Sequence, residues 1–390
     1  MKNKKLIFMD KKKIEPYFNL GKSGLLILFA IFFMAIGGAQ AQEKKKKKKK
    51  KKPVYSASFT LGTTYDDNIL KYSEKYLDRF MNSEDEGRFH IDTYDDVIFN
   101  TGISINSTFY IFKKRKSVIN IGANRRTYAI NKVKNWSYIT IGIRQYLAHR
   151  ISFKFSYSYI PEFYVRHFRD REWIQVYGFE PISFQPYAFS KDNYGFYIQK
   201  YFFKGTRIKF SLFYSPYYHN EHYTEYDSKN WSYITRIYQK VHKNITLDAE
   251  YQFITSDAKG YDASYQTPET TLGPDATYVE DRFSFGVSWK LPKIFKKTNS
   301  LNVKSSFQNR YYSSKYRPIT DPLHAGRVDK NVRLYFDYRI SFNKSLKLKA
   351  FYYRYMRDSS TEAELNKQYI SDEKDYTQNL IGLEFIYTLK

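Results

Sequence analysis

Residues 151–159 read Ile-Ser-Phe-Lys-Phe-Ser-Tyr-Ser-Tyr, with an aromatic or aliphatic residue at every second position. Three serines and Lys154 occupy the positions between them. Because successive side chains of a β-strand point to opposite faces, this period of two predicts a strand with one apolar and one polar face. The chain sustains no comparable helical period.

The same alternation returns along the rest of the chain, which gives fourteen expected strands in all. Each run is long enough to cross a membrane as a tilted strand of about 9 to 11 residues. The runs are 54–65, 96–112, 117–130, 136–147, 151–165, 188–202, 206–218, 231–241, 245–255, 281–291, 300–313, 331–342, 346–357 and 376–390.

The connections between these runs alternate in length, apart from one short link at 131–135. Short turns on one side and long loops on the other are typical of bacterial outer-membrane barrels, whose long loops are extracellular. We therefore expect residues 54–390 to form an all-β, antiparallel up-and-down transmembrane barrel of about 14 strands. A soluble β-sandwich or propeller also alternates, but it rarely has such one-sided loops. The long loops are 66–95, 166–187, 219–230, 256–280, 314–330 and 358–375.

The N-terminus has the pattern of a secretory signal peptide. A lysine-rich start precedes the apolar run 25–36 and then Ala39-Gln40-Ala41, which suits signal peptidase. We expect residues 1–41 to be removed, so that the mature chain starts at Gln42. An uncleaved membrane anchor is the alternative, although the apolar run is short for a membrane span.

Residues 42–53 contain consecutive lysines from Lys44 to Lys52, within a chain of net charge +26. Like charges repel and bury nothing, so this segment is expected to be a disordered periplasmic tail. It is either simply solvated or an electrostatic tether to anionic phosphates. The chain has no cysteine, which excludes disulfides and a lipid-modified cysteine. Nucleic acid is not an expected partner of an exported chain.

One seven-residue sequence occurs twice. Lys-Asn-Trp-Ser-Tyr-Ile-Thr stands at 134–140 and again at 229–235, each time at the start of an expected strand. Amphipathic rings favour the headgroup level of a membrane. We therefore expect an aromatic girdle that includes the Trp and Tyr of both copies. These residues are Trp136, Tyr138, Trp231 and Tyr233.

The polar phase of the expected strands carries many more Lys and Arg than Asp and Glu. A barrel of about 8 strands is filled by its own side chains, whereas 16 to 18 strands enclose a channel, so fourteen predict a narrow pore unless a loop plugs it. A positive pore favours anions. The arginines expected to line the lumen are Arg207, Arg236, Arg282, Arg310, Arg333 and Arg339.

Two short segments resemble known outer-membrane barrels. Tyr65-Asp66-Asp67-Asn68, at the end of the first expected strand, resembles the Y-D-D-N start of porin-like barrels of Gram-negative bacteria. Residues 379–390 resemble the C-terminal targeting strand, although they end on Lys390 rather than on an aromatic residue. The resemblance implies the outer membrane as location, the barrel-assembly machinery as a partner, and a surrounding of outer-membrane lipid and lipopolysaccharide.

Signals for catalysis are weak. His219 and His222 flank Glu221 in a loop, but a third ligand for a metal ion is missing from this pattern. Neither a G-x-S-x-G sequence nor a phosphate-binding glycine loop occurs. We therefore expect no metal, no cofactor and no enzymatic activity.

The leading functional prediction is a porin-like channel for small anionic or polar solutes. The first alternative is a non-conducting surface barrel that acts as an adhesin, anchor or assembly component through tyrosine-rich loops. The second alternative is a lipid-acting outer-membrane enzyme, whose catalytic residues the sequence does not single out.

Overall fold

The computed structural model describes residues 53–389, except 112–114, 149, 262–272 and 295. The expected signal peptide and nearly all of the lysine-rich tail lie outside these residues. None of the helices in the described ranges is long and apolar enough to cross a membrane.

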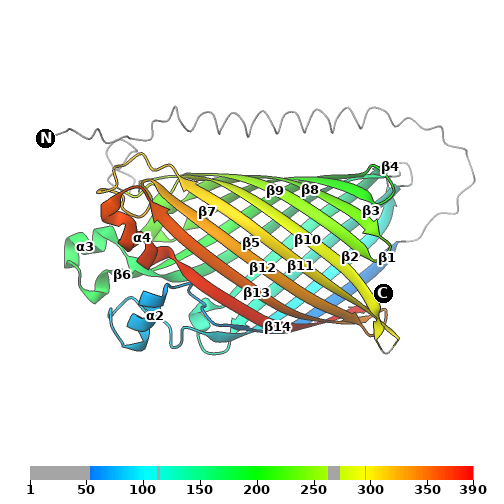
Figure 1. Cartoon of the computed structure of the whole chain (residues 1–390), viewed down its shortest axis with the longest axis horizontal. Helices are drawn as coiled ribbons and strands as arrows, with labels where there is room; N and C mark the ends of the chain where they lie inside the picture. The colour runs from blue at the N-terminus through cyan, green and yellow to red at the C-terminus, as the bar shows by residue number, and fades with distance from the viewer. Residues whose placement is uncertain (1–52, 112–114, 149, 262–272, 295, 390) are drawn as a thin grey trace, which may run out of the picture. The chain divides into compact units, whose positions relative to one another are not determined.

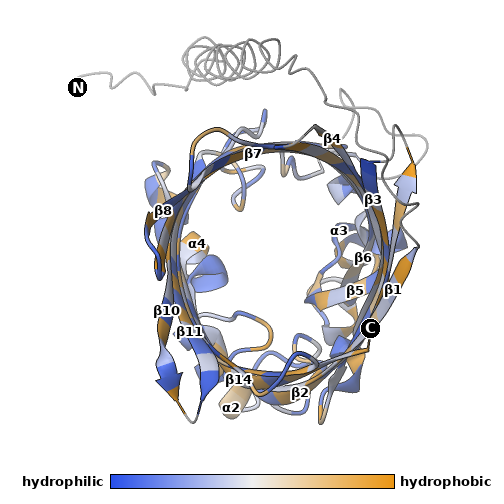
Figure 2. Ribbon diagram, turned by 90° about the vertical axis from the view of Figure 1, so that its right-hand side faces the viewer, coloured by the Kyte–Doolittle hydropathy of each residue, from blue (hydrophilic) through white to orange (hydrophobic). Residues whose placement is uncertain are grey.

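Fourteen antiparallel strands form one closed barrel (Figure 1), which confirms the predicted fold class. Each strand pairs with its neighbours in the chain, and β1 pairs with β14. Figure 2, which looks along the barrel, shows the strands as a ring. The strands are β1 (Val54–Asp66), β2 (Asp96–Ile111), β3 (Arg115–Tyr128), β4 (Trp136–Ala148), β5 (Ile151–Arg169), β6 (Phe184–Tyr201), β7 (Thr206–His219), β8 (Ser228–His242), β9 (Ile245–Ala258), β10 (Tyr278–Ile294), β11 (Lys297–Tyr312), β12 (Arg327–Ser341), β13 (Leu346–Thr361) and β14 (Tyr376–Leu389).

The outer surface of the wall is apolar. In β4, Ile139 and Ile141 are 53% and 48% exposed, and in β10 Phe283 and Phe285 are 49% and 55% exposed. Large exposed apolar side chains in alternate positions of closed strands are the lipid-facing belt of a membrane barrel. Closure leaves no unpaired strand edge, as lipid requires. The molecule therefore has the architecture of an outer-membrane barrel.

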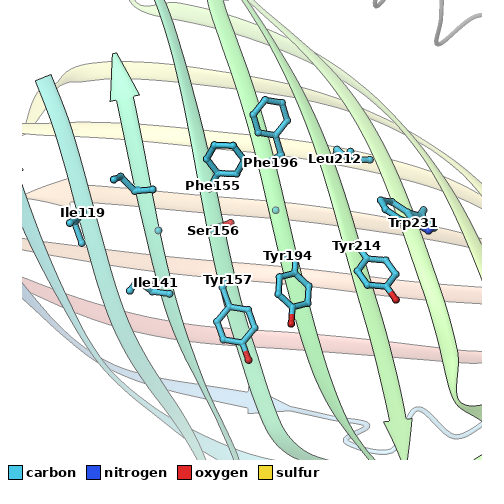
Figure 3. A pocket seen from close by; sticks show the side chains of 13 residues that line it. Ile119, Ile141, Phe155, Ser156, Tyr157, Tyr194, Phe196, Leu212, Tyr214 and Trp231 are labelled. Atoms are coloured by element: carbon cyan, nitrogen blue, oxygen red, sulfur yellow. The ribbon is translucent and has the colours of Figure 1, made fainter. Parts of the chain in front are cut away.

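A shallow groove of about 570 Å³ lies on this outer wall (Figure 3). Aromatic rings from neighbouring strands line it in register: Phe155 lies 5.0 Å from Phe196, and Tyr214 lies 4.7 Å from Trp231, measured between ring centroids. Such cross-strand ring pairs stabilise the sheet.

Several strand boundaries differ from the prediction, and two hairpins show the difference clearly. Residues 292–299 were expected to be a turn, but β10 continues to Ile294 and β11 begins at Lys297. The hairpin β5–β6 is also longer than expected, because β5 reaches Arg169 and β6 begins at Phe184. This extension places Arg166 on a strand rather than in a loop.

In their described residues the long loops carry the α-helices α2 (Glu74–Met81), α3 (Arg171–Tyr177) and α4 (Lys367–Lys374), which all lie at the same end of the barrel (Figure 1). Asp170 caps α3 by accepting hydrogen bonds from the backbone N–H groups of Glu172 and Trp173, at 2.7 and 3.2 Å. The opposite end carries the short turns. The long loops mark the extracellular end.

The first loop packs against the inner wall at this end. Ile98 of β2 is 2% exposed and alternates with the outward-facing Phe99, so it points into the barrel. It belongs to a buried cluster with the loop residues Ile69, Leu70 and Tyr72. The loop thus buries Ile69, Leu70 and Tyr72 against the inner wall instead of leaving them in solvent.

Candidate functional site in the lumen

The structure places all six predicted arginines on the lumen face, because each alternates with outward-facing apolar residues. Their surroundings differ. Glu280, which is fully buried, accepts hydrogen bonds from Arg282 at 2.8 Å and from Arg310 at 2.7 Å. Glu280 was predicted to lie in the loop 256–280, but it belongs to β10, which begins at Tyr278. It neutralises much of the charge of both arginines.

Arg236 and Arg339 also have acidic neighbours. The Arg236 guanidinium lies 2.7 Å from the Asp248 carboxylate, whereas Arg339 is only 3.9 Å from Asp337 and its side chain is 55% exposed. These residues line a cavity of about 430 Å³ in the lumen. Its wall carries both signs of charge. The lining residues are Arg236, Asp248, Gly286, Val287, Ser288, Asn302, Val303, Lys304, Tyr335, Asp337 and Arg339.

Arg207 and Arg333 have aromatic rather than acidic neighbours. The guanidinium carbon of Arg207 lies 3.7 Å from the centroid of Tyr238, and that of Arg333 lies 5.8 Å from the centroid of Tyr355. Within the described part of the chain neither arginine has a carboxylate within 4 Å. Their positive charge is therefore available to the lumen.

A group of cations gathers near the extracellular end of the lumen. We call it the cationic collar and define it as Lys71, Arg166, Arg333, Arg357 and Lys374. Its members come from the first loop, β5, β12, β13 and α4. Positions up to about 300 residues apart in the sequence are brought to one level of the barrel.

Tyr376 of β14 lies at one side of the collar. It is opposite Arg357 in the sheet register, and its ring centroid is 5.0 Å from the Arg357 guanidinium and 5.8 Å from Lys71 Nζ. Arg357 Nε donates to Asn331 Oδ1 at 3.1 Å. Arg333 follows Asn331 by two residues on the same face of β12. The register therefore sets Arg357 and Arg333 beside one another, and Lys71 reaches them by its contact with the Tyr376 ring.

Arg166 lies at the other side of the collar. Its guanidinium donates to the backbone oxygens of Leu70 and Lys71, the latter at 3.1 Å, and stacks 4.4 Å above the ring centroid of Tyr72. Lys71 has a φ of 54°, in the left-handed region that non-glycine residues rarely adopt. Arg166 thus stabilises the turn that directs Lys71 toward Tyr376.

The carboxylates around the collar have other partners. Glu373 accepts from Tyr76 at 2.5 Å and from Arg88 at 3.3 Å, and Asp329 accepts from Arg327 at 2.8 Å. Among the described residues, no carboxylate lies within 4 Å of a collar cation. The collar therefore presents five basic side chains without an acidic partner within this distance.

The loop lysines of the collar respond to this field. Its enclosure by the barrel and the positive charges of Arg357 and Arg333 lower the pKa of Lys71. Burial, followed by the positive charge of Arg327, lowers the pKa of Lys374 to about 7. The part of each shift that comes from nearby cations has the sign expected where an anion would be stabilised.

The aromatic girdle prediction is only partly consistent with the structure. Trp231 is 40% exposed on the outer wall, and Tyr233 has the same phase. Trp136 and Tyr138 instead alternate with the outward Ile139, so the girdle assignment is wrong for them. Trp136 packs against the inner cluster and stacks under Arg126 at 5.1 Å.

The loop histidines are engaged with protein groups. His222 Nδ1 lies 2.9 Å from Asp170 Oδ2, and His219 Nε2 lies 2.9 Å from the Tyr187 hydroxyl. The ranges that the structure describes contain no group of three His, Asp or Glu side chains that could hold a metal ion.

Sequence reasoning missed four of the five collar residues. Arg166 and Arg357 lie at the extracellular ends of their strands, where the alternation weakens. Lys71 and Lys374 are loop residues, and nothing in the local pattern shows that their loops fold inward. A usable signal was the occurrence of Arg at or next to predicted strand ends, as at Arg166 and Arg357.

Comparison with known proteins gives likeness of architecture only. No family model and no curated protein matches the chain. Solved structures of similar architecture include a bacterial polysaccharide outer-membrane secretin (TM-score 0.45, 8% identity, 86% of this chain and 98% of that chain). A second is the outer-membrane channel DcaP of Acinetobacter baumannii, with a TM-score of 0.43 and 11% identity over 87% of this chain and 99% of that chain. A third is an anion-selective porin from Comamonas acidovorans, with a TM-score of 0.40 and 8% identity over 87% of this chain and 99% of that chain.

Proposed function

We propose that this protein is a porin-like channel of the outer membrane that favours small anionic solutes and also admits polar ones. The observation that carries the proposal is the cationic collar, in which five cations from five elements face the lumen without acidic partners. The channel needs no cofactor and performs no chemistry on its solute.

The physical basis is the focusing of an electric field. Fixed charges on low-dielectric walls raise the local concentration of the opposite ion, and rings of Arg and Lys are used for anion pores. The Debye length falls from about 10 Å at 0.1 M salt to about 3 Å at 1 M. Anion preference is therefore expected to weaken as the salt concentration rises.

Zero-current potentials in planar bilayers test the proposal. In a salt gradient the wild-type barrel should be anion-selective, and Arg333→Glu combined with Arg357→Glu should shift the potential toward cation selectivity. The matched control is Lys243→Glu with Lys344→Glu, which makes the same charge change in exposed periplasmic turns and should leave selectivity nearly unchanged. A wild-type barrel without conductance would contradict the channel.

The adhesin alternative depended on a tyrosine-rich loop, and the structure uses most of those tyrosines internally. Tyr223 is 3% exposed and Tyr226 packs against His324, whereas Tyr218 is 51% exposed. We further propose that outer-membrane lipid and lipopolysaccharide surround the belt, and that the barrel-assembly machinery recognises β14.

A further inference from the structure

We propose that the cationic collar, together with Asn331, is a binding site for an oxyanion with two or more negative charges, such as the phosphate group of a small solute. The proposal rests on the proposed function and deepens it, because it assigns the preferred solute to a discrete site rather than to the general field of the pore.

Asn331 supplies the first evidence for a missing ligand. It is 3% exposed, its Oδ1 accepts from Arg357 Nε, and its Nδ2 has no hydrogen-bond partner in the described structure. The bond to Arg357 fixes the amide so that the N–H₂ group is the free end. Buried donors are almost always satisfied by protein, water or ligand. An oxyanion oxygen beside Arg357 is the chemical group that this donor requires.

Arg166 supplies the second piece of evidence for a missing ligand. Its Nη2 is used by the carbonyls of Leu70 and Lys71, while its buried Nε has no partner among the described atoms. A guanidinium presents several N–H donors in one plane, and pairs of these donors match two oxygens of a phosphate or carboxylate.

The charge of the collar selects the class of anion. A chloride or a single carboxylate would leave most of the positive charge of these basic side chains uncompensated. A phosphate group carries close to two charges and offers three or four acceptor oxygens, so it can contact several members of the collar at once. Multiply charged oxyanions are therefore preferred over monovalent ones.

The collar is also organised before a ligand arrives. Aromatic rings lie under Arg166, Arg357 and Lys71, and these contacts restrict the orientations of the three side chains. Less side-chain freedom is then lost on binding. The left-handed backbone at Lys71 agrees with this view, since strained residues concentrate at ligand sites.

Equilibrium dialysis of the folded, full-length mature barrel in detergent against labelled inorganic phosphate or pyrophosphate tests the site without requiring conduction. We expect saturable binding of one ion per chain, with pyrophosphate tighter than phosphate and chloride unable to compete at equal concentration. Arg357→Gln should weaken binding at least tenfold, and so should Asn331→Leu. Arg339→Gln, which removes a lumen arginine outside the collar, should leave it within twofold.

The same samples in planar bilayers separate the two proposals. Saturable binding in a barrel that does not conduct supports the site and contradicts the channel. An anion-selective barrel that shows no saturable phosphate binding, or whose binding ignores both Arg357→Gln and Asn331→Leu, overturns the site and leaves the channel. Gel migration of unboiled samples verifies that each variant is folded, and Lys374→Met replaces any variant that is not.

Discussion

Phe285 lies in the middle of β10 and faces the lipid, where it is 55% exposed. Replacing it with Arg should lower the free energy of unfolding by about 2 to 4 kcal/mol, the cost of a cation near the bilayer midplane. Ser288→Arg is the matched control, because Ser288 belongs to the same strand but lines the lumen cavity. Urea titrations in lipid vesicles measure both variants, and equal losses would mean that the two faces are assigned the wrong way round.

Lys134 predicts a dependence of stability on pH. It is 5% exposed and donates to the backbone oxygens of Tyr164 and Val165, and burial, with the charges of Lys71 and Arg166, lowers its pKa to about 7. Between pH 7 and about 10.5 the unfolded chain holds a proton that the folded chain lacks, so stability rises with pH across this window.

The melting temperature of the wild-type barrel should accordingly increase from pH 7 to pH 9. Lys134→Met removes the titrating group and should show a smaller increase over the same interval. An increase of the same size in both proteins would show that the group is not buried in its neutral form.

Trp136 and Trp231 show at the residue level what sequence can and cannot predict. Both stand in the sequence Lys-Asn-Trp-Ser-Tyr-Ile-Thr, yet Trp136 faces the lumen and Trp231 faces the lipid. The residues that follow the shared sequence decide which face points to the lipid. In β4, Ile141 and Ile143 continue the outward apolar set of Ile139. In β8, Ile237 faces outward and Arg236 faces the lumen, so the same seven residues have the opposite orientation. A heptapeptide alone does not contain this information.

Hydrogen bonds of the segment Asp66-Asp67-Asn68 join β1 to β14. The Asp66 carboxylate accepts two 2.8 Å hydrogen bonds from Gln378, and Asp67 accepts two from Asn379, both at 2.6 Å. Asn68 donates to the backbone oxygen of Thr377 at 2.9 Å. The segment therefore fixes the register of the strand pair that closes the barrel.

A double-mutant cycle measures this contribution. Asp67→Ala, Asn379→Ala and their combination should give a coupling free energy of about 1.5 to 3 kcal/mol, as expected for hydrogen bonds to a charged group. The neutral pair Ser58 and Thr388, 3.0 Å apart across the same two strands, is the control and should couple by about 0.5 to 1.5 kcal/mol. Unfolding in urea provides the values, and equal coupling in both pairs would remove any special role for Asp67.

Existence and order of the strands were predictable because each strand must separate lipid from lumen, which imposes the period of two. Strand ends were less predictable. Beyond the lipid belt both faces become polar or aromatic, so the extension of β5 to Arg169 and the start of β10 before Glu280 leave no alternation to read. These strand ends carry charged side chains that face the lumen.

Across the whole molecule, the first and last long loops are joined over the mouth. Tyr76 and Arg88 of the first loop bind Glu373 of α4, and the Arg88 guanidinium lies 4.2 Å from the Tyr76 ring centroid. Only Arg333 of the collar was predicted from sequence. Arg166 and Arg357 lie at strand ends where the alternation weakens, and Lys71 and Lys374 depend on such contacts between loops. No local pattern encodes a contact between residues almost 300 positions apart.

The hydrogen bonds between Asp67 and Asn379 join residues 312 positions apart, whereas every other strand pair is a hairpin or a single loop connection. The free-energy cost of closing a loop grows by about 0.6 kcal/mol for each doubling of the number of residues in the loop. The loop closed by β1 and β14 is about four doublings longer than that of a hairpin, so its closure costs about 2.5 kcal/mol more. The strands can therefore pair one after another along the chain, and the pairing of β1 with β14 closes the barrel last. Until then the collar does not exist, so an incompletely assembled chain has no anion selectivity.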